Sequence, residues 1–144
     1  MTLAELSADG ALATVLYALV GSALLAVGLA ALDLVTPGSL AERVRVDHSP
    51  NAGVLASANL VSVTAIVAVA GITATSEDLG DGLASMAFYG ALGIALQALF
   101  LFVVERTLRG QLDTMLRSDR LDPVATTLAT AVVALGVITA VAVS

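Results

Sequence analysis

Four long apolar stretches alternate with short polar segments along the chain. Residues 11–32, 51–76, 82–104 and 124–144 contain no Asp, Glu, Lys or Arg. A helix of about 20 apolar residues is long enough to cross the ~30 Å hydrocarbon core of a bilayer. The pattern therefore predicts an all-α integral membrane protein in which four transmembrane helices form a single domain over residues 1–144.

The composition supports this assignment. The chain is 58% hydrophobic and only 12% charged, whereas about a quarter of the residues in soluble domains are charged. The net charge is −6 and no basic stripe is present, which argues against nucleic-acid binding. The chain has no Cys, so disulfides and thiolate metal sites are excluded.

All six basic residues are arginines, and all lie in the first and third connections, residues 33–51 and 105–123. They are Arg43, Arg45, Arg106, Arg109, Arg117 and Arg120. Short loops rich in Lys and Arg face the cytoplasm. We therefore expect both connections to be cytoplasmic and both termini to lie outside.

The two halves of the chain match when one is shifted by 72 residues, and no gap is needed. The matched pairs include Tyr17 with Tyr89, Gly21 with Gly93, Gly38 with Gly110, Arg45 with Arg117, and Asp47 with Asp119. We interpret this as an internal duplication with units at about 11–75 and 83–144. Each unit holds two helices, so both insert the same way up, and a pseudo-two-fold axis along the membrane normal is expected.

Each cytoplasmic connection is expected to contain a short amphipathic helix lying at the membrane interface. In the first, Leu40, Ala41 and Val44 share one face. In the second, the apolar positions are Leu112, Met115 and Leu116. The alternative is an irregular loop.

The next helices have recognisable start signals. Asn51 follows Pro50 and is the expected N-cap of the second transmembrane helix. Asp122 before Pro123 fits an N-cap followed by proline at the first helical position.

Two amide side chains lie inside the apolar stretches, at similar depth. Asn59 is eight residues into the second helix, and Gln97 is eight residues before Glu105. One hypothesis is that they hydrogen-bond across helices, or line a polar path with Ser62 and other hydroxyl residues. Those residues are Thr64 and Thr130. The alternative is a structural bond that only holds the bundle together.

Asp33 and Glu105 are matched acids at the cytoplasmic ends of the first and third helices. A carboxylate is unfavourable at the negative end of a helix dipole, so a compensating partner is expected. Arg43 or Arg45 would serve Asp33, and Arg109 would serve Glu105. Such an acid either latches the interfacial helix or forms a cation or proton site at a pore mouth.

Small residues recur every four positions on two helices. They are Ser22, Ala26 and Ala30 in the first, and Ala87, Ala91 and Ala95 in the third. This spacing allows close helix approach in lipid and suggests packing faces within the bundle or between protomers, although Ala-rich sequence also produces it by chance.

The pattern formed by Asp33, Thr36, Pro37, Asn51 and the small residue that follows, placed between two apolar helices and then duplicated, resembles the domain-of-unknown-function 350 family of bacterial membrane proteins. The resemblance covers the whole chain. It implies an inner-membrane location and a link with envelope maintenance, and it supplies no activity.

The second copy departs from this pattern. Glu105 replaces the aspartate, Leu108 and Arg109 replace Thr-Pro, and Asp122 with Pro123 replaces the Asn step. Any role of the motif is therefore expected in the first copy alone.

The chain lacks the residue sets of common enzymes, with one His, no Ser-His-acid set and no phosphate loop. We expect no catalytic, cofactor-binding or metal-binding residues. The favoured interpretation is a structural or interaction module, probably a homo-oligomer in its bilayer, that presents arginines to anionic lipid or a cytoplasmic protein. The alternative is an oligomeric ion channel or small-solute transporter that uses the intramembrane polar residues.

Overall fold

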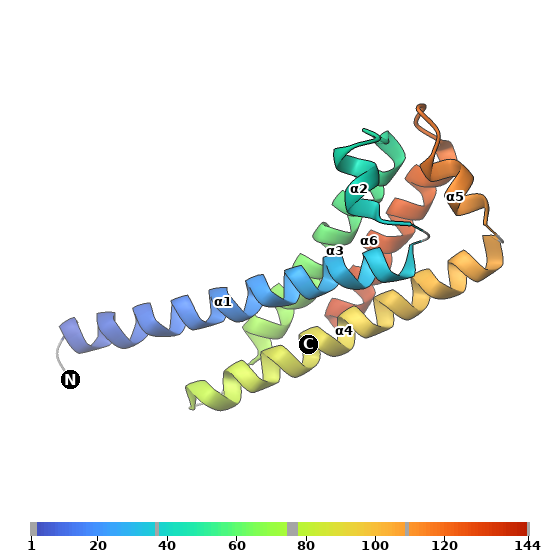
Figure 1. Cartoon of the computed structure of the whole chain (residues 1–144). Coiled ribbons are helices and arrows are strands. Elements are labelled where there is room, and N and C mark those ends of the chain that lie inside the picture. The colour runs from blue at the N-terminus through green and yellow to red at the C-terminus, as the bar shows by residue number, and fades with distance from the viewer. Residues whose placement is uncertain (1–2, 37, 75–77, 109, 144) are drawn as a thin grey trace.

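The computed structural model describes residues 3–36, 38–74, 78–108 and 110–143, and these form helices joined by short connections (Figure 1). The helices are α1 (Leu3–Val35), α2 (Leu40–Arg45), α3 (Pro50–Thr73), α4 (Leu79–Leu108), α5 (Gln111–Leu116) and α6 (Pro123–Val143). Four segments are long and apolar enough to cross a membrane: Gly10–Val35, Pro50–Thr73, Leu79–Leu108 and Pro123–Val143. The predicted all-α class and the number of long apolar helices are confirmed.

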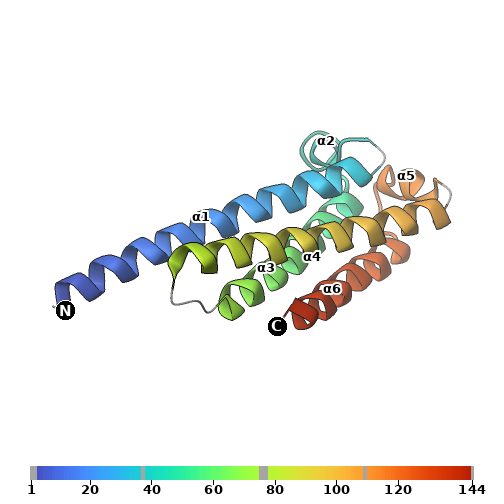
Figure 2. The same cartoon turned by 90° about the horizontal axis from the view of Figure 1, so that it is seen from below.

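The order long helix, short helix, long helix occurs twice. Helices α1 and α4 run side by side in the same direction, and α3 and α6 do the same (Figures 1 and 2). Both short helices, α2 and α5, lie at one end of the bundle, where their residues contact each other. The start of α1 and the end of α6 lie toward the opposite end (Figure 1).

The contacts between helices do not have two-fold symmetry. An axis along the membrane normal would exchange α1 with α4 and α3 with α6, so the α3–α4 contact would require an equal α1–α6 contact. Helices α3 and α4 pack together, but over the described residues α1 and α6 do not form a comparable pair. The predicted pseudo-two-fold axis is therefore wrong. The second half instead lies beside the first as if shifted sideways (Figure 2).

The two short helices are reached through matching glycine turns. Gly38 has φ 78° and Gly110 has φ 83°, a left-handed conformation that side chains with a Cβ rarely adopt. After Gly38, Ser39 caps α2, because its Oγ accepts a hydrogen bond from the Glu42 N–H at 3.3 Å. The turn chemistry therefore fixes where each short helix begins.

The N-cap of α3 is Ser49 rather than Asn51, as the sequence had suggested. Ser49 Oγ accepts from the Ala52 N–H at 3.3 Å, and Pro50 occupies the first helical position. The correction has a physical reason, because the Asn51 side chain is turned inward to bind another connection. At the start of α6 the prediction is confirmed, since Asp122 Oδ1 accepts from the Val124 N–H at 2.8 Å.

The two short helices differ in the accuracy of their predicted faces. In α5 the expected apolar residues are buried, namely Leu112, Met115 and Leu116. In α2 Leu40 is buried as expected, but Arg43 is buried too, while Ala41 and Val44 are exposed. The α2 prediction was therefore wrong in orientation, because an arginine partner on α5 turns the helix.

Glycines, rather than the regularly spaced Ser and Ala residues, line the packing faces. Ser22, Ala26 and Ala30 are exposed on α1, as are Ala91 and Ala95 on α4, and Ala87 is half-buried. The proposed faces are therefore wrong as contacts within the bundle. A Cβ added at Gly90 would approach Leu24 Cδ1 to 2.6 Å, and one added at Gly28 would approach Val63 Cγ2 to 2.8 Å.

The tightest of these approaches joins α3 and α6. A Cβ added at Gly136 would lie 2.8 Å from the Cα of Ser62. Backbone cannot rotate away as a side chain can, so the two helices would have to separate. The α3–α6 contact therefore depends on the absence of a side chain at this position.

We expect Gly136→Ala to lower the free energy of unfolding by about 1–3 kcal/mol, the usual cost of overpacking. Unfolding of the purified protein in mixed micelles would measure this. The matched control is Gly53→Ala in α3, where nothing lies within 4 Å of the added Cβ. It should be neutral or slightly stabilising, and equal losses in both variants would contradict the argument.

Candidate functional site

An inner cluster of Asn59, Ser62 and Gln97 joins the four long helices through hydrogen bonds. Gln97 Nε2 donates to Asn59 Oδ1 at 2.7 Å. Asn59 Nδ2 donates to the Gly28 carbonyl at 3.3 Å. The Ser62 hydroxyl lies 3.0 Å from Gln97 Oε1 and 3.1 Å from the Val132 carbonyl, with one proton to share between them. The predicted direct contact between the two amides is confirmed.

The inner cluster is dry. Asn59 and Gln97 are each 2% exposed and Ser62 is 1% exposed. The gap that these amides share with Gly28 and Val63 has no room for a water molecule. Every buried side-chain nitrogen and oxygen in the described part of the chain has a hydrogen-bond partner. The cluster therefore leaves no polar atom over for a passing ion or solute.

The predicted polar path does not form. Thr64 and Thr130 are exposed on the outside of α3 and α6, and the Thr130 hydroxyl donates to the Thr126 carbonyl of its own helix at 2.8 Å. Only Ser62 among the three hydroxyl residues joins the amides.

A second cluster lies at the end of the bundle that carries α2 and α5, and Asn51 is at its centre. Asn51 is fully buried. Its Nδ2 donates to the carbonyls of Met115 and Arg120, each at 2.9 Å, with the Ser118 carbonyl at 3.4 Å. Its Oδ1 accepts from the Asp122 N–H at 2.8 Å. One side chain from the first half thus holds the connection between α5 and α6.

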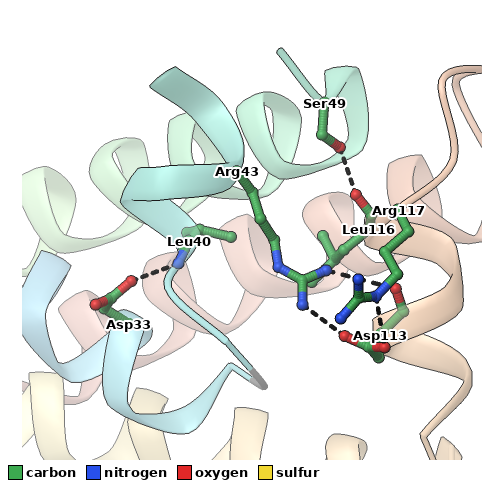
Figure 3. A network of polar contacts seen from close by, with 7 residues as sticks. All are labelled: Asp33, Leu40, Arg43, Ser49, Asp113, Leu116 and Arg117. Atoms are coloured by element: carbon green, nitrogen blue, oxygen red, sulfur yellow. Dashed lines mark hydrogen bonds and ion pairs between the residues drawn. The ribbon is translucent and has the colours of Figure 1, made fainter. Parts of the chain in front are cut away.

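Ser49 adds a parallel link beside it. Its hydroxyl donates to the Leu116 carbonyl at 2.7 Å while its oxygen caps α3 (Figure 3). Ser49 and Asn51 together fix the end of α5 against the start of α3.

An ion pair joins the two short helices (Figure 3). Arg43 Nη2 lies 2.5 Å from Asp113 Oδ1, and Arg117 Nε lies 2.9 Å from Asp113 Oδ2. The hydrogen bonds from Arg43 and then Arg117 hold the pKa of the Asp113 carboxyl below its usual range. Arg43 was a predicted partner of Asp33, and this prediction is wrong because Asp113 takes it.

Asp33 is held by backbone groups. Its Oδ1 accepts from the Leu40 N–H at 2.5 Å and from the Ala41 N–H at 3.3 Å (Figure 3). It therefore latches the first turn of α2 to the end of α1, through N–H groups rather than an arginine. Nearby, Thr36 is buried and its N–H donates to the Leu32 carbonyl at 3.0 Å.

The corresponding acid in the second half has a different setting. Glu105 is half-buried and has no hydrogen-bond or ion-pair partner among the described residues. Two of the predicted site residues, Pro37 and Arg109, lie outside the described residues, so the expected pair of Arg109 with Glu105 also lies outside them.

The other arginines lie on the surface. Arg45, Arg106, Arg117 and Arg120 are exposed, and the Arg106 guanidinium lies 6.0 Å from the centre of the Phe102 ring. Within the described residues, no three His, Cys, Asp or Glu side chains form a group that would hold a metal ion.

A family model described as Domain of Unknown Function (DUF350) matches residues 5–143. The chain belongs to the DUF350 family. The resemblance inferred from the Asp33, Thr36, Pro37 and Asn51 pattern is thus confirmed, and Asn51, the last residue of that pattern, is the one that ties the two connections of this DUF350 protein together.

Relatives with the same architecture are bacterial. The chain is 38% identical over 135 residues to the UPF0719 transmembrane protein of Mycolicibacterium paratuberculosis, covering 94% of this chain and 89% of that protein. UPF0719 transmembrane proteins of Mycobacterium bovis and Mycobacterium tuberculosis are each 39% identical over 128 residues, covering 89% of this chain and 82% of each relative. No solved structure matches the chain. This DUF350 protein is therefore a multi-pass transmembrane protein with four spans.

Several residues of the second cluster were missed as partners in the sequence. Asp113 and Ser49 carry no motif, and the carbonyls that bind Asn51 have no signature at all. A usable signal exists in the 72-residue comparison, since Ser49, Asn51 and Asp113 face Leu121, Pro123 and Ala41 at the matched positions. A polar residue with an apolar counterpart marks a contact between the halves.

We expect Asn59→Leu and Gln97→Leu to destabilise the protein non-additively. A double-mutant cycle in mixed micelles should give a coupling free energy of about 0.6 kcal/mol and up to about 1.7 kcal/mol, the range for hydrogen bonds between membrane helices. Exposed Thr130→Val paired with Gln97→Leu is the control and should be additive. Zero coupling between the amides would rule out their direct bond.

We expect Asn51→Ala to lower the free energy of unfolding by at least about 2 kcal/mol, because buried carbonyls and the Asp122 N–H lose their partners. Asn51→Asp keeps the acceptor and removes the donors, so it should be equally harmful or worse. Thermal unfolding in detergent would measure both. Wild-type stability in either variant would show that this side chain does not hold the α5–α6 connection.

Proposed function

We propose that this protein is a non-conducting structural and interaction module of the bacterial inner membrane, with no catalytic chemistry. One observation carries the proposal: the intramembrane polar atoms of Asn59, Ser62 and Gln97 are all engaged by other helices, with no water-sized space among them. Polar residues inside a membrane either serve a pathway or hold helices together, and a dry cluster supports the second role.

The orientation belongs to the same proposal. The arginines gather in residues 33–51 and 105–123, so we place these connections in the cytoplasm and both termini outside. The short helices α2 and α5 then lie at the cytoplasmic interface. Their shared location at one end of the bundle supports this assignment (Figure 1).

The two connections act as one surface in this proposal. Arg43 is bound to Asp113, and Asn51 holds the α5–α6 connection, so neither connection moves without the other. Exposed Arg45, Arg117 and Arg120 are offered to anionic lipid or to a cytoplasmic protein, and nearby acids offset part of their charge. A homo-oligomer would bring several such surfaces together, as maintenance of the envelope by a scaffold requires.

The internal duplication is also part of the proposal. Two observations favour it beyond the sequence match: the repeated order of long and short helices, and the positive φ angles of Gly38 and Gly110, which lie 72 residues apart. A duplicated hairpin that adapted one side to the other would give the sideways relationship of the halves.

The proposal is tested by ion flux through the purified protein in liposomes, scanning monovalent cations, protons and anions. We expect no current above that of empty liposomes, in the wild type and in Gln97→Leu alike. An ionophore added at the end of each trace confirms that the vesicles are sealed. A selective current that Gln97→Leu abolishes would overturn the module and establish the alternative, an oligomeric channel.

A further inference from the structure

A groove at the end of the first membrane span combines two opposite charges with an apolar floor. It encloses about 380 Å³ between α1, α2 and α3, within the range of about 300–1,000 Å³ typical of ligand pockets. Asp33 and Arg45 supply the charges. Small apolar residues, including Ala30, Ala41 and Ala56, line the rest.

Small side chains open this groove in the first half of the chain. The positions 72 residues later carry larger ones: Phe102 for Ala30, Asp113 for Ala41, Leu116 for Val44 and Leu128 for Ala56. Leu116 and Leu128 are buried against the first half. The same face in the first half has no protein packed on it, and its alanines leave the space that the leucines fill in the second.

The groove runs from polar to apolar along the membrane normal. Asp33 lies in the last turn of the Gly10–Val35 span, and Ala30 lies about 4.5 Å deeper at 1.5 Å per residue. Ala56 lies six residues into α3, about 9 Å from its start by the same rise. A phospholipid has this order of headgroup and acyl chain, whereas a water-soluble ligand does not.

We propose that the groove binds one phospholipid whose headgroup carries an ammonium, as ethanolamine does. Arg45 binds the phosphate, since a guanidinium matches phosphate oxygens. Asp33 binds the ammonium. Both hydrogen bonds that Asp33 accepts from α2 use Oδ1, so Oδ2 faces no backbone donor and is available to the headgroup. An acyl chain then lies against the alanines.

Charge selects this headgroup over an anionic one. A phosphatidylglycerol would satisfy Arg45 but would place no positive charge beside the Asp33 carboxylate. The site depends only on the membrane location of the chain, so it stands or falls separately from the absence of ion flux.

The experiment is native mass spectrometry of the delipidated full-length protein, titrated with dioleoyl phosphatidylethanolamine or dioleoyl phosphatidylglycerol. We expect one saturable phosphatidylethanolamine per chain, bound more tightly than phosphatidylglycerol by about fivefold or more, the factor that a single favourable charge contact readily supplies. Melting temperatures recorded on the same samples confirm that every variant is folded.

Three variants separate the parts of the site. Asp33→Asn still accepts the Leu40 N–H through Oδ1 but loses its charge, so it should abolish the preference between the two lipids. Arg45→Gln lies on the surface and should weaken both. Ala56→Leu inserts the residue of the second half and should exclude both, while Ala91→Leu on the exposed face of α4 should bind as the wild type does.

Three results would overturn the proposal. They are no saturable lipid on the folded wild type, a preference for phosphatidylglycerol, or phosphatidylethanolamine binding that Ala56→Leu and Arg45→Gln leave unchanged. A preference for phosphatidylglycerol would assign the exposed arginines, rather than the groove, as the lipid contact.

Discussion

Hydrocarbon gives helices no apolar reason to associate, because a leucine is as well solvated by lipid as by another helix. Association in this protein therefore depends on close backbone approach and on hydrogen bonds between helices. Gly136 supplies the first by letting α6 meet the backbone of Ser62. Ser62, Asn59 and Gln97 supply the second. The two effects occur at the same place, so the inner cluster exists only because the glycine permits it.

The polar contacts between the halves are built from residues that the 72-residue match does not conserve. Asn59 and Ser62 face Ala131 and Ala134 at the matched positions, and Gln97 faces Leu25. Arg43 faces Met115, and Asp113 faces Ala41. The sideways relationship explains this difference. A face of the first half that packs on the second half corresponds to a face of the second half that packs on nothing in the chain, where a polar residue would meet lipid.

The long helices were predictable because a membrane demands about 20 consecutive apolar residues, and no tertiary information is needed to see them. The Asn59–Gln97 bond was also predictable, since two amides at equal depth in hydrocarbon have few other partners. The role of Asn51 was not. An asparagine beside a proline is a sound N-cap by local rules, and only the position of the α5–α6 connection shows that Ser49 takes that role. The two-fold axis failed for a similar reason, because matching sequence fixes the direction of insertion but not the side on which a copy packs.

The hydrogen bonds of Asn51 also bear on the order in which the chain is made. The second span is complete when residue 73 has been synthesised, but the carbonyls that satisfy Asn51 belong to residues 115–120. Ser62 likewise waits for Gln97 and Val132, whereas Asn59 finds Gly28 within its own hairpin. The first hairpin therefore enters the membrane as an unfinished intermediate. Its polar groups commit it to the later half of the same polypeptide, and a nascent chain truncated before residue 115 would leave Asn51 dependent on water at the bilayer surface.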